Sequence, residues 1–115
     1  MKQFDPKYLD DMSGGDAEFV RDILSTFLET AQDLVRALTE AASESDFDKA
    51  IYASHTLKGS ARSVGAAPLG DLCEELEKLA RNRDATGYAA MASHVPVCFA
   101  ELGEELAVVL RADAA

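Results

Sequence analysis

The sequence predicts an all-α protein, an antiparallel four-helix bundle with a short N-terminal lid helix. Three observations support this fold class. Apolar residues recur at helical spacing almost throughout the 115 residues, the links between these stretches are short, and only three prolines interrupt the chain. A chain of this length is sufficient for one hydrophobic core, so we expect one domain over residues 1–115.

Capping residues and glycines divide the chain into five expected helices. Asp5 and Pro6 are typical of the start of a short helix over residues 5–12, which stops at the following Ser-Gly-Gly. Ser13 with Asp16, and Ser45 with Asp48, have capping-box spacing, so we expect the second and third helices to begin there. The fourth helix is expected from Pro68 to residues 82–84. The fifth is expected over 86–111, with Pro96 kinking it or opening one turn.

Each of the four long expected helices has an apolar stripe that predicts its buried side. The stripes comprise Phe19, Ile23, Phe27, Ala31, Leu34 and Leu38 in the second helix, Phe47, Ala50, Ser54, Leu57, Ala61 and Val64 in the third, Leu69, Leu72, Cys73, Leu76 and Leu79 in the fourth, and Tyr88, Met91, Val95, Cys98, Phe99, Leu102, Leu106 and Val109 in the fifth.

Composition excludes several classes of function. A net charge of −10 argues against nucleic-acid binding, which depends on clustered cations. The longest uncharged run, residues 85–100, is too short and too interrupted to cross a bilayer. The two cysteines, Cys73 and Cys98, lack metal-ligand spacing and are expected to be free, buried thiols in a reducing cytoplasm. No metal-ligand spacing of histidines and carboxylates occurs on any expected helix.

The segment HTLKGSARSVGA, residues 55–66, places polar groups opposite the apolar stripe of the third helix. At about 100° per residue, His55 lies roughly 160° from Leu57 and therefore faces outward. Tyr52, Lys58 and Gly59 lie one turn from it. An exposed glycine within a helix costs about 1 kcal/mol relative to alanine, so Gly59 is best explained by the clearance that it gives a bulky partner approaching His55.

The expected hairpin between the third and fourth helices brings a carboxylate to the same height. His55 lies eleven residues before the link at Ala66, and Glu77 lies eleven residues after it. A hydrogen bond from one imidazole nitrogen to Glu77 fixes the tautomer and leaves the other nitrogen as a nucleophile. Lys58 can offset the charge of an incoming phosphoryl group. There is no phosphate-binding glycine-rich loop, so the pattern indicates a place that holds a phosphoryl group without making it from ATP.

This pattern resembles the histidine-containing phosphotransfer (HPt) domains of bacterial phosphorelays. The family motif is a histidine, then Leu-Lys-Gly two to four positions later and Gly-Ala ten and eleven positions later. It is matched by His55, Leu57, Lys58, Gly59, Gly65 and Ala66. Glu77 falls where the family often has Gln or Glu. Ser54 stands where the family usually has alanine, and its small size is compatible with that position. The resemblance extends over nearly the whole chain.

The resemblance implies that His55 accepts a phosphoryl group from the aspartyl phosphate of one receiver domain and passes it to another. Lys58 would then stabilise the phosphoryl oxygens, and Gly59 would admit the receiver. It implies no cofactor of the chain's own, no kinase activity, and Mg²⁺ on the partner receiver. The partners are response-regulator receiver domains, with a hybrid histidine kinase as a further one. We expect a cytoplasmic monomer that binds neither nucleic acid nor membranes.

Several residues near the motif have alternative interpretations. Around His55, Lys58 and Arg62 predict a locally positive surface on an acidic protein, and Tyr52 and Arg62 are docking candidates. His94 is expected to be a packing or hydrogen-bonded histidine. Two other functions remain open: a receiver-binding module that carries no phosphate, and an HPt domain cut from a hybrid or chemotaxis-type kinase.

Overall fold

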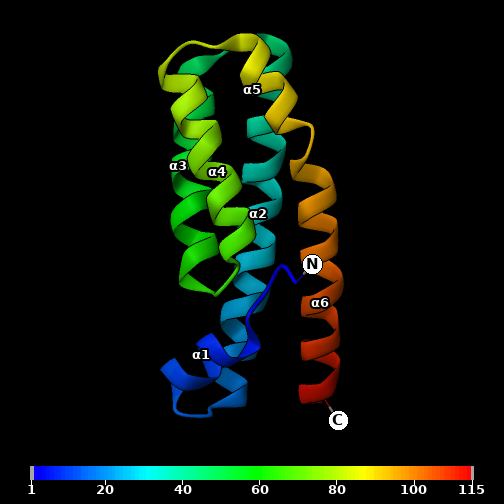
Figure 1. Ribbon diagram of the computed structural model, residues 1–115. Helices are drawn as coiled ribbons and strands as arrows, with labels where there is room; N and C mark the ends of the chain where they lie inside the picture. Colours follow the sequence, from blue (N-terminus) through cyan, green and yellow to red (C-terminus); the bar gives the residue numbers. More distant parts are fainter. Residues whose placement is uncertain (1, 115) are drawn as a thin grey trace.

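The structure is a computed structural model that describes residues 2–114, with side chains described up to residue 111. Its elements are α1 (Pro6–Ser13), α2 (Ala17–Glu44), α3 (Phe47–Ser63), α4 (Ala67–Arg81), α5 (Ala85–Ala92) and α6 (Val95–Ala114). Helices α2, α3 and α4 run antiparallel to their chain neighbours, and α5 and α6 together form the fourth column (Figure 1). The predicted antiparallel bundle is thereby confirmed.

The fourth column is divided near the proline of its apolar stretch. Residues 93 and 94 form a turn between α5 and α6, and Pro96 is the second residue of α6. Proline lacks the N–H that would continue a helical hydrogen-bond ladder, but it fits the first turn of a helix. The predicted opening of a turn at Pro96 is confirmed, and it produces two helices rather than one.

The predicted capping serines are wrong at both sites. Ser13 is the last residue of α1, because Gly14 and Gly15 follow with φ angles of +68° and +87°. Asp16 is the N-cap of α2, where its carboxylate accepts a hydrogen bond from the backbone N–H of Phe19. Ser45 ends α2 in the left-handed region, and Asp46 caps α3 by accepting from the N–H of Lys49. An aspartate next to the first turn therefore replaces the serine in each case.

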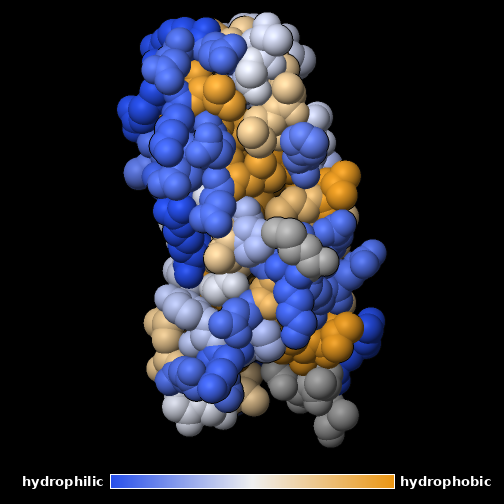
Figure 2. Space-filling model, viewed as in Figure 1, coloured by the Kyte–Doolittle hydropathy of each residue, from blue (hydrophilic) through white to orange (hydrophobic). Residues whose placement is uncertain are grey.

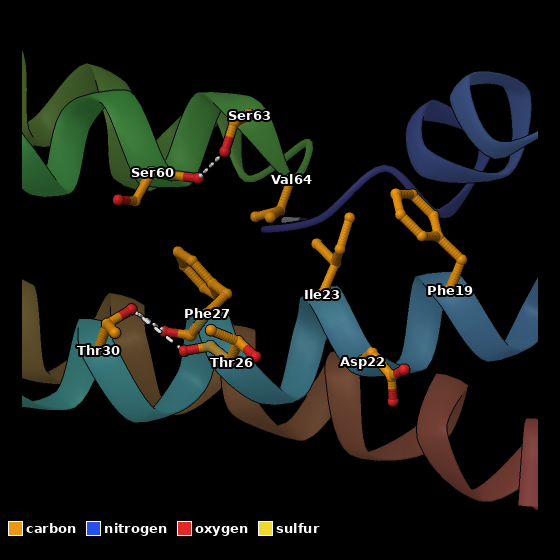
Figure 3. A pocket seen from close by; sticks show the side chains of 9 residues that line it. All are labelled: Phe19, Asp22, Ile23, Thr26, Phe27, Thr30, Ser60, Ser63 and Val64. Carbon is orange, nitrogen blue, oxygen red and sulfur yellow. Dashed lines mark hydrogen bonds between the residues drawn. The ribbon is translucent and has the colours of Figure 1, made fainter.

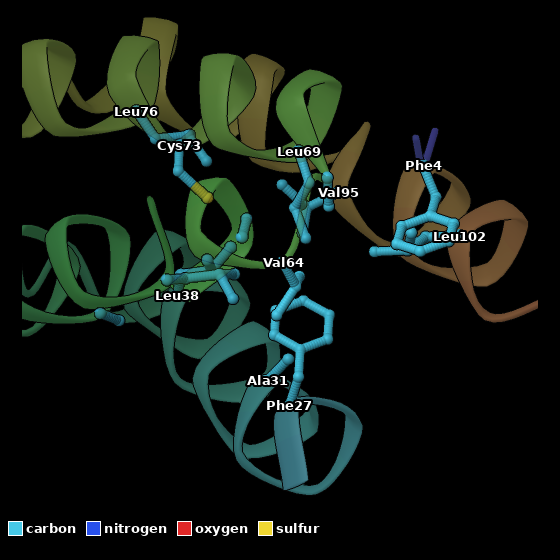
Figure 4. Packing of buried hydrophobic residues seen from close by; sticks show 14 of the residues in the cluster. Phe4, Phe27, Ala31, Leu38, Val64, Leu69, Cys73, Leu76, Val95 and Leu102 are labelled. Atoms are coloured by element: carbon cyan, nitrogen blue, oxygen red, sulfur yellow. The ribbon is translucent and has the colours of Figure 1, made fainter. Parts of the chain in front are cut away.

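The apolar stripes meet in one core between the four columns (Figure 4). One predicted stripe residue is an exception: the side chain of Phe19 is 49% exposed, because it lies near the start of α2, beyond the end of α3. The core is composed mainly of Leu24, Phe27, Ala31, Leu38, Leu57, Ala61, Leu69, Cys73, Leu76, Tyr88, Val95, Leu102 and Leu106.

The segment before α1 contacts both α6 and the link between α3 and α4. Phe4 is buried in the core, and the backbone N–H groups of Gln3 and Phe4 donate to the carboxylate of Glu105 in α6. The N–H of Asp5 donates to the carbonyl of Gly65 in the α3–α4 link, at 3.0 Å. Gly65 has a φ of +87°, the left-handed conformation that glycine commonly adopts just after a helix. The α3–α4 hairpin, which carries the motif, is thus anchored at its turn.

Candidate functional site

The outer side of α3 presents His55 to solvent. Ala50, Ser54, Leu57 and Ala61 bury the inner side of this helix, and the His55 side chain on the opposite side is 63% exposed. The buried hydroxyl of Ser54 donates to the carbonyl of Ala50 at 2.6 Å. Serine at this position therefore leaves no unsatisfied polar group in the core.

The α3–α4 hairpin places Glu77 beside His55, as the register of the two helices predicts. The imidazole Nδ1 lies 3.2 Å from Oε1 and 3.2 Å from Oε2 of Glu77. The carboxylate itself lies between the helices, with a side chain that is 9% exposed. The expected contact between His55 and Glu77 is therefore confirmed.

Glu77 also contacts two cations. Lys58 donates from Nζ to Oε1 at 2.8 Å, and Arg81 donates to Oε2 from Nε at 3.1 Å and from Nη2 at 2.8 Å. Burial by itself raises the pKa of Glu77, but the hydrogen bonds from Lys58, Arg81 and His55 outweigh this effect and lower the pKa to about 2. Glu77 is therefore ionised throughout the physiological range.

The ionised carboxylate determines which imidazole nitrogen carries hydrogen. A carboxylate only accepts hydrogen bonds, so Nδ1 of neutral His55 must be the donor. In this tautomer Nε2 has a free lone pair. Because the side chain is mostly exposed, this nitrogen is the nucleophile that the site can offer.

Space for a partner is available next to the ring. A Cβ atom placed on Gly59 would meet nothing within 4 Å, and the Tyr52 side chain is 69% exposed. No packing contact within the described chain therefore requires glycine at position 59. The roles of Tyr52 and Gly59 in docking stay predictions.

The expected locally positive surface around His55 is wrong, because the nearby cations are paired with carboxylates. Lys58, 20% exposed, is bound to Glu77. Arg62 donates to Asp71 at 3.2 Å and to Glu74 at 3.4 Å. The stem of Arg62 lies across Gly70 of α4, where an added Cβ would come within 2.7 Å of the Arg62 Cγ. Arg62 is thus engaged with α4 rather than free for a partner.

Sequence reasoning missed Arg81, which completes the site. The available signal was the spacing of Glu77 and Arg81, which lie four residues apart on α4 and form an i,i+4 pair. That spacing is common on helix surfaces. It becomes informative only when Glu77 is known to lie against α3.

The second histidine lies in a different environment from the one expected. His94 is exposed in the turn between α5 and α6, so the packing role is wrong. Its ring makes no hydrogen bond within the described part of the chain, and no carboxylate orients it as Glu77 orients His55. The distinction between the two histidines is therefore one of surroundings rather than exposure.

A groove of about 510 Å³ lies on the other flank of α3, against α2. Figure 3 shows Phe19, Ile23 and Phe27 projecting from α2 toward Val64 and Ser60 of α3. The remaining lining residues are Asp22, Thr26, Thr30 and Ser63. In contrast, hydrophilic side chains gather over α4 (Figure 2).

The described part of the chain lacks a metal-binding cluster and a membrane-spanning helix. Within residues 2–114, no group of three or more His, Cys, Asp or Glu side chains is placed to hold a metal ion. None of the described helices is long and apolar enough to cross a membrane. The thiols of Cys73 and Cys98 are free, with Cys73 buried and Cys98 partly buried.

Comparison with known protein families matches residues 22–112 to the family described as Hpt domain. Among solved structures, the chain is similar to the histidine-containing phosphotransfer protein B (HptB) from Pseudomonas aeruginosa PAO1, with a TM-score of 0.69 and 22% sequence identity. That similarity covers 97% of this chain and 91% of the other, and at this identity it shows a shared fold. No curated protein matches. The matched range includes Glu77 and the three residues that contact its carboxylate, which are His55, Lys58 and Arg81.

Proposed function

Because the chain belongs to the Hpt domain family, we propose that it relays a phosphoryl group between the aspartates of receiver domains through His55. The observation that carries this proposal is the exposed imidazole whose Nδ1 is bound to the ionised Glu77. One nitrogen is committed to the scaffold, and the other is left open to solvent as a nucleophile.

The transfer step is an in-line displacement at phosphorus. The lone pair of Nε2 attacks the phosphorus of the receiver's aspartyl phosphate, and the bond between phosphorus and the aspartate oxygen breaks. The electron pair of that bond stays on the aspartate, which leaves as a carboxylate. The ring keeps its Nδ1 proton and gains positive charge as the Nε2–P bond forms. Glu77, 3.2 Å away, stabilises this charge. Transfer to a second receiver reverses the same step.

The other groups of the reaction come from both proteins. Lys58, one turn from His55, is the cation of this chain that can reach the phosphoryl oxygens. The receiver supplies its acidic pocket and Mg²⁺, so the chain acts without a cofactor or ATP-dependent kinase activity of its own. Gly59 and Tyr52 lie where the receiver would dock. We propose a monomer, because His55 and Tyr52 must stay uncovered, and we place the reaction in the cytoplasm.

The test is the transfer of an isotopically labelled phosphoryl group from phosphorylated receiver domains of the same genome. We expect rapid labelling of the wild-type chain and none in His55→Gln. His94→Gln is the matched control, since it removes an exposed imidazole that lacks a carboxylate partner, and it should label like the wild type. Receiver binding without labelling of the wild type would favour the interaction module that carries no phosphate. Labelling that persists in His55→Gln would remove His55 from the mechanism.

A further inference from the structure

The two oxygens of Glu77 have different partners, and this division suggests different roles for the two cations. Oε1 accepts from Lys58, which belongs to α3, while Oε2 accepts two N–H groups from Arg81, which belongs to α4 like Glu77 itself. The bonds from Arg81 to Oε2 therefore lie within one helix, whereas the bond from Lys58 to Oε1 connects two helices. The imidazole Nδ1 is equidistant from both oxygens.

Lys58 has two competing tasks if the proposed function holds. In the resting protein its ammonium lies 2.8 Å from Glu77. A phosphoryl group on Nε2 lies on the far side of the ring from Nδ1, so turning the same ammonium toward it draws the ammonium away from Oε1. A carboxylate with only 9% of its side chain exposed is strongly destabilised when its charge partner is removed. Without a second cation, Glu77 would oppose the movement of Lys58 or take up a proton.

We propose that Arg81 is a positioning residue that keeps Glu77 ionised and oriented while Lys58 moves from Glu77 to the phosphoryl group. This inference rests on the proposed function, since it assumes that His55 receives a phosphoryl group. Arg81 does not touch the reacting atoms. It acts through Glu77, whose carboxylate holds the Nδ1 proton of His55.

The geometry of Arg81 suits an anchor that stays in place. Two of its N–H groups converge on one oxygen, which restricts rotation of the carboxylate more than a single bond does. When Lys58 departs, the N–H of Nδ1 is the remaining hydrogen-bond donor to Oε1. That bond strengthens as the ring gains positive charge. Glu77 thus keeps its two hydrogen bonds from Arg81 throughout, while the Nδ1–H of the ring replaces Lys58 at Oε1.

The neighbouring cations are committed elsewhere and provide matched controls. Lys78 pairs with Glu75 at 3.6 Å, and Arg83 lies 3.6 Å from Asp48. Lys78→Met therefore removes one positive charge from α4, as Arg81→Met does, without removing a contact to Glu77.

The experiment combines transfer kinetics with ¹⁵N NMR of the His55 ring, which distinguishes a ring protonated at Nδ1 from one protonated at Nε2. We expect the wild type to hold its proton on Nδ1. Arg81→Met should transfer phosphate about 10-fold more slowly, while Lys58 still holds Glu77 in its resting state. The Nδ1 tautomer preference should be lost in the double variant Lys58→Met/Arg81→Met, in which neither cation holds Glu77. Compared with methionine at position 81, Arg81→Lys should recover part of the transfer rate, and in combination with Lys58→Met it should recover part of the tautomer preference. Lys58→Met should also transfer slowly but keep the wild-type tautomer, because Arg81 still holds Glu77. Lys78→Met should change neither measurement.

Some outcomes would overturn the inference and leave the proposed function standing. Wild-type transfer by Arg81→Met, or an unchanged Nδ1 tautomer in the double variant Lys58→Met/Arg81→Met, would exclude Arg81 as the anchor. Loss of the tautomer in Lys58→Met to the same extent as in the double variant would exclude the division of roles between the two cations. A wild-type chain that takes no phosphate from any receiver would instead refute the proposed function.

Discussion

The two flanks of α3 are built from different interactions. On the α4 flank, carboxylates of α4 hold Lys58 and Arg62 and orient His55. On the α2 flank, an open groove is lined by the apolar side chains of Phe27 and its neighbours (Figure 3). Charge pairs therefore determine the geometry of the reactive side, and apolar packing provides the stability that supports it. Substitutions on the two flanks should separate function from stability.

The largest change in stability is expected from the α2 flank. Phe27 is 4% exposed and packs in the core near Val64 of α3 (Figure 4). Phe27→Ala removes most of a buried aromatic side chain and leaves a cavity, so the free energy of unfolding should fall by about 3–5 kcal/mol. Urea unfolding measures this loss. Transfer by the molecules that remain folded should stay near the wild-type rate, and a selective loss of transfer would show that the flanks are not separable.

The largest change in function is expected from Glu77 on the α4 flank. Glu77→Met removes the acceptor for Nδ1 and leaves Lys58 and Arg81 without their carboxylate, so transfer should slow by about 10- to 100-fold. Glu77→Gln keeps one acceptor oxygen and should lose less. The control is Glu74→Met, which removes a carboxylate of the same helix that contacts Arg62. Equal rates for Glu74→Met and Glu77→Met would mean that transfer depends on the charge of α4 rather than on the contact with His55.

The same carboxylate should make stability depend on acid pH. The pKa of Glu77 is about 2 in the folded protein, against 4.5 for an ordinary glutamate. The stabilisation that ionised Glu77 gives to the folded protein is fully present above about pH 4.5. Below pH 4.5, Glu77 takes up a proton in the unfolded chain before it does so in the folded protein. This stabilisation is therefore lost as the pH falls from about 4.5 to about 2. We expect a contribution of about 1–2 kcal/mol, less than the full linkage value because solvent screens its partners His55 and Arg81.

Urea unfolding of the wild type and Glu77→Met at pH 7 and pH 3 measures this contribution. The other carboxylates titrate in both proteins, so the difference between the two proteins isolates Glu77. The difference in the free energy of unfolding between the wild type and Glu77→Met should be smaller at pH 3 than at pH 7. A constant difference would show that the charge pairs around Glu77 do not stabilise the fold.

The backbone of the site was more predictable from sequence than its charge pairs were. Helical periodicity gives the buried side of α3, and counting from the link at Ala66 gives the height of Glu77 beside His55. Both follow from the fixed rise and rotation of a helix. The start of α4 was predictable for another reason: Pro68 lies in its first turn, where the missing N–H of proline is tolerated.

The pairing of long side chains does not follow from that geometry. Lys58 pairs with Glu77, whereas Arg62 pairs with both Asp71 and Glu74. The flexible stems of both cations select these partners only in the packed structure. The predicted positive surface was wrong for this reason. Arg81 was missed because an i,i+4 pair has the same spacing whether it is buried or exposed. The prediction about Phe19 failed because periodicity cannot indicate where a neighbouring helix ends.

Gly59 allows a test in which stability and function should change in opposite directions. A Cβ at Gly59 or at Gly103 would meet nothing within 4 Å, so alanine at either position should raise the free energy of unfolding by about 0.5–1 kcal/mol. Gly59→Ala also adds a methyl group where the receiver is proposed to approach, and transfer should slow by about 5-fold. Gly103→Ala should transfer at the wild-type rate. Slow transfer in both variants would attribute the loss to helix rigidity instead of docking.

The smallest effect is expected from Arg62, whose pairs lie at the outer edge of the α4 flank. Its side chain is 41% exposed, and its partners Asp71 and Glu74 are 72% and 42% exposed. Exposed pairs of this kind contribute little to stability. If a docked receiver does not draw Arg62 away from α4, Arg62→Ala should slow transfer less than Lys58→Ala at both low and high salt. An equal loss that disappears at high salt would show that the receiver attracts Arg62 out of its pairs, and the α4 flank would then include a docking cation as well as a fixed network.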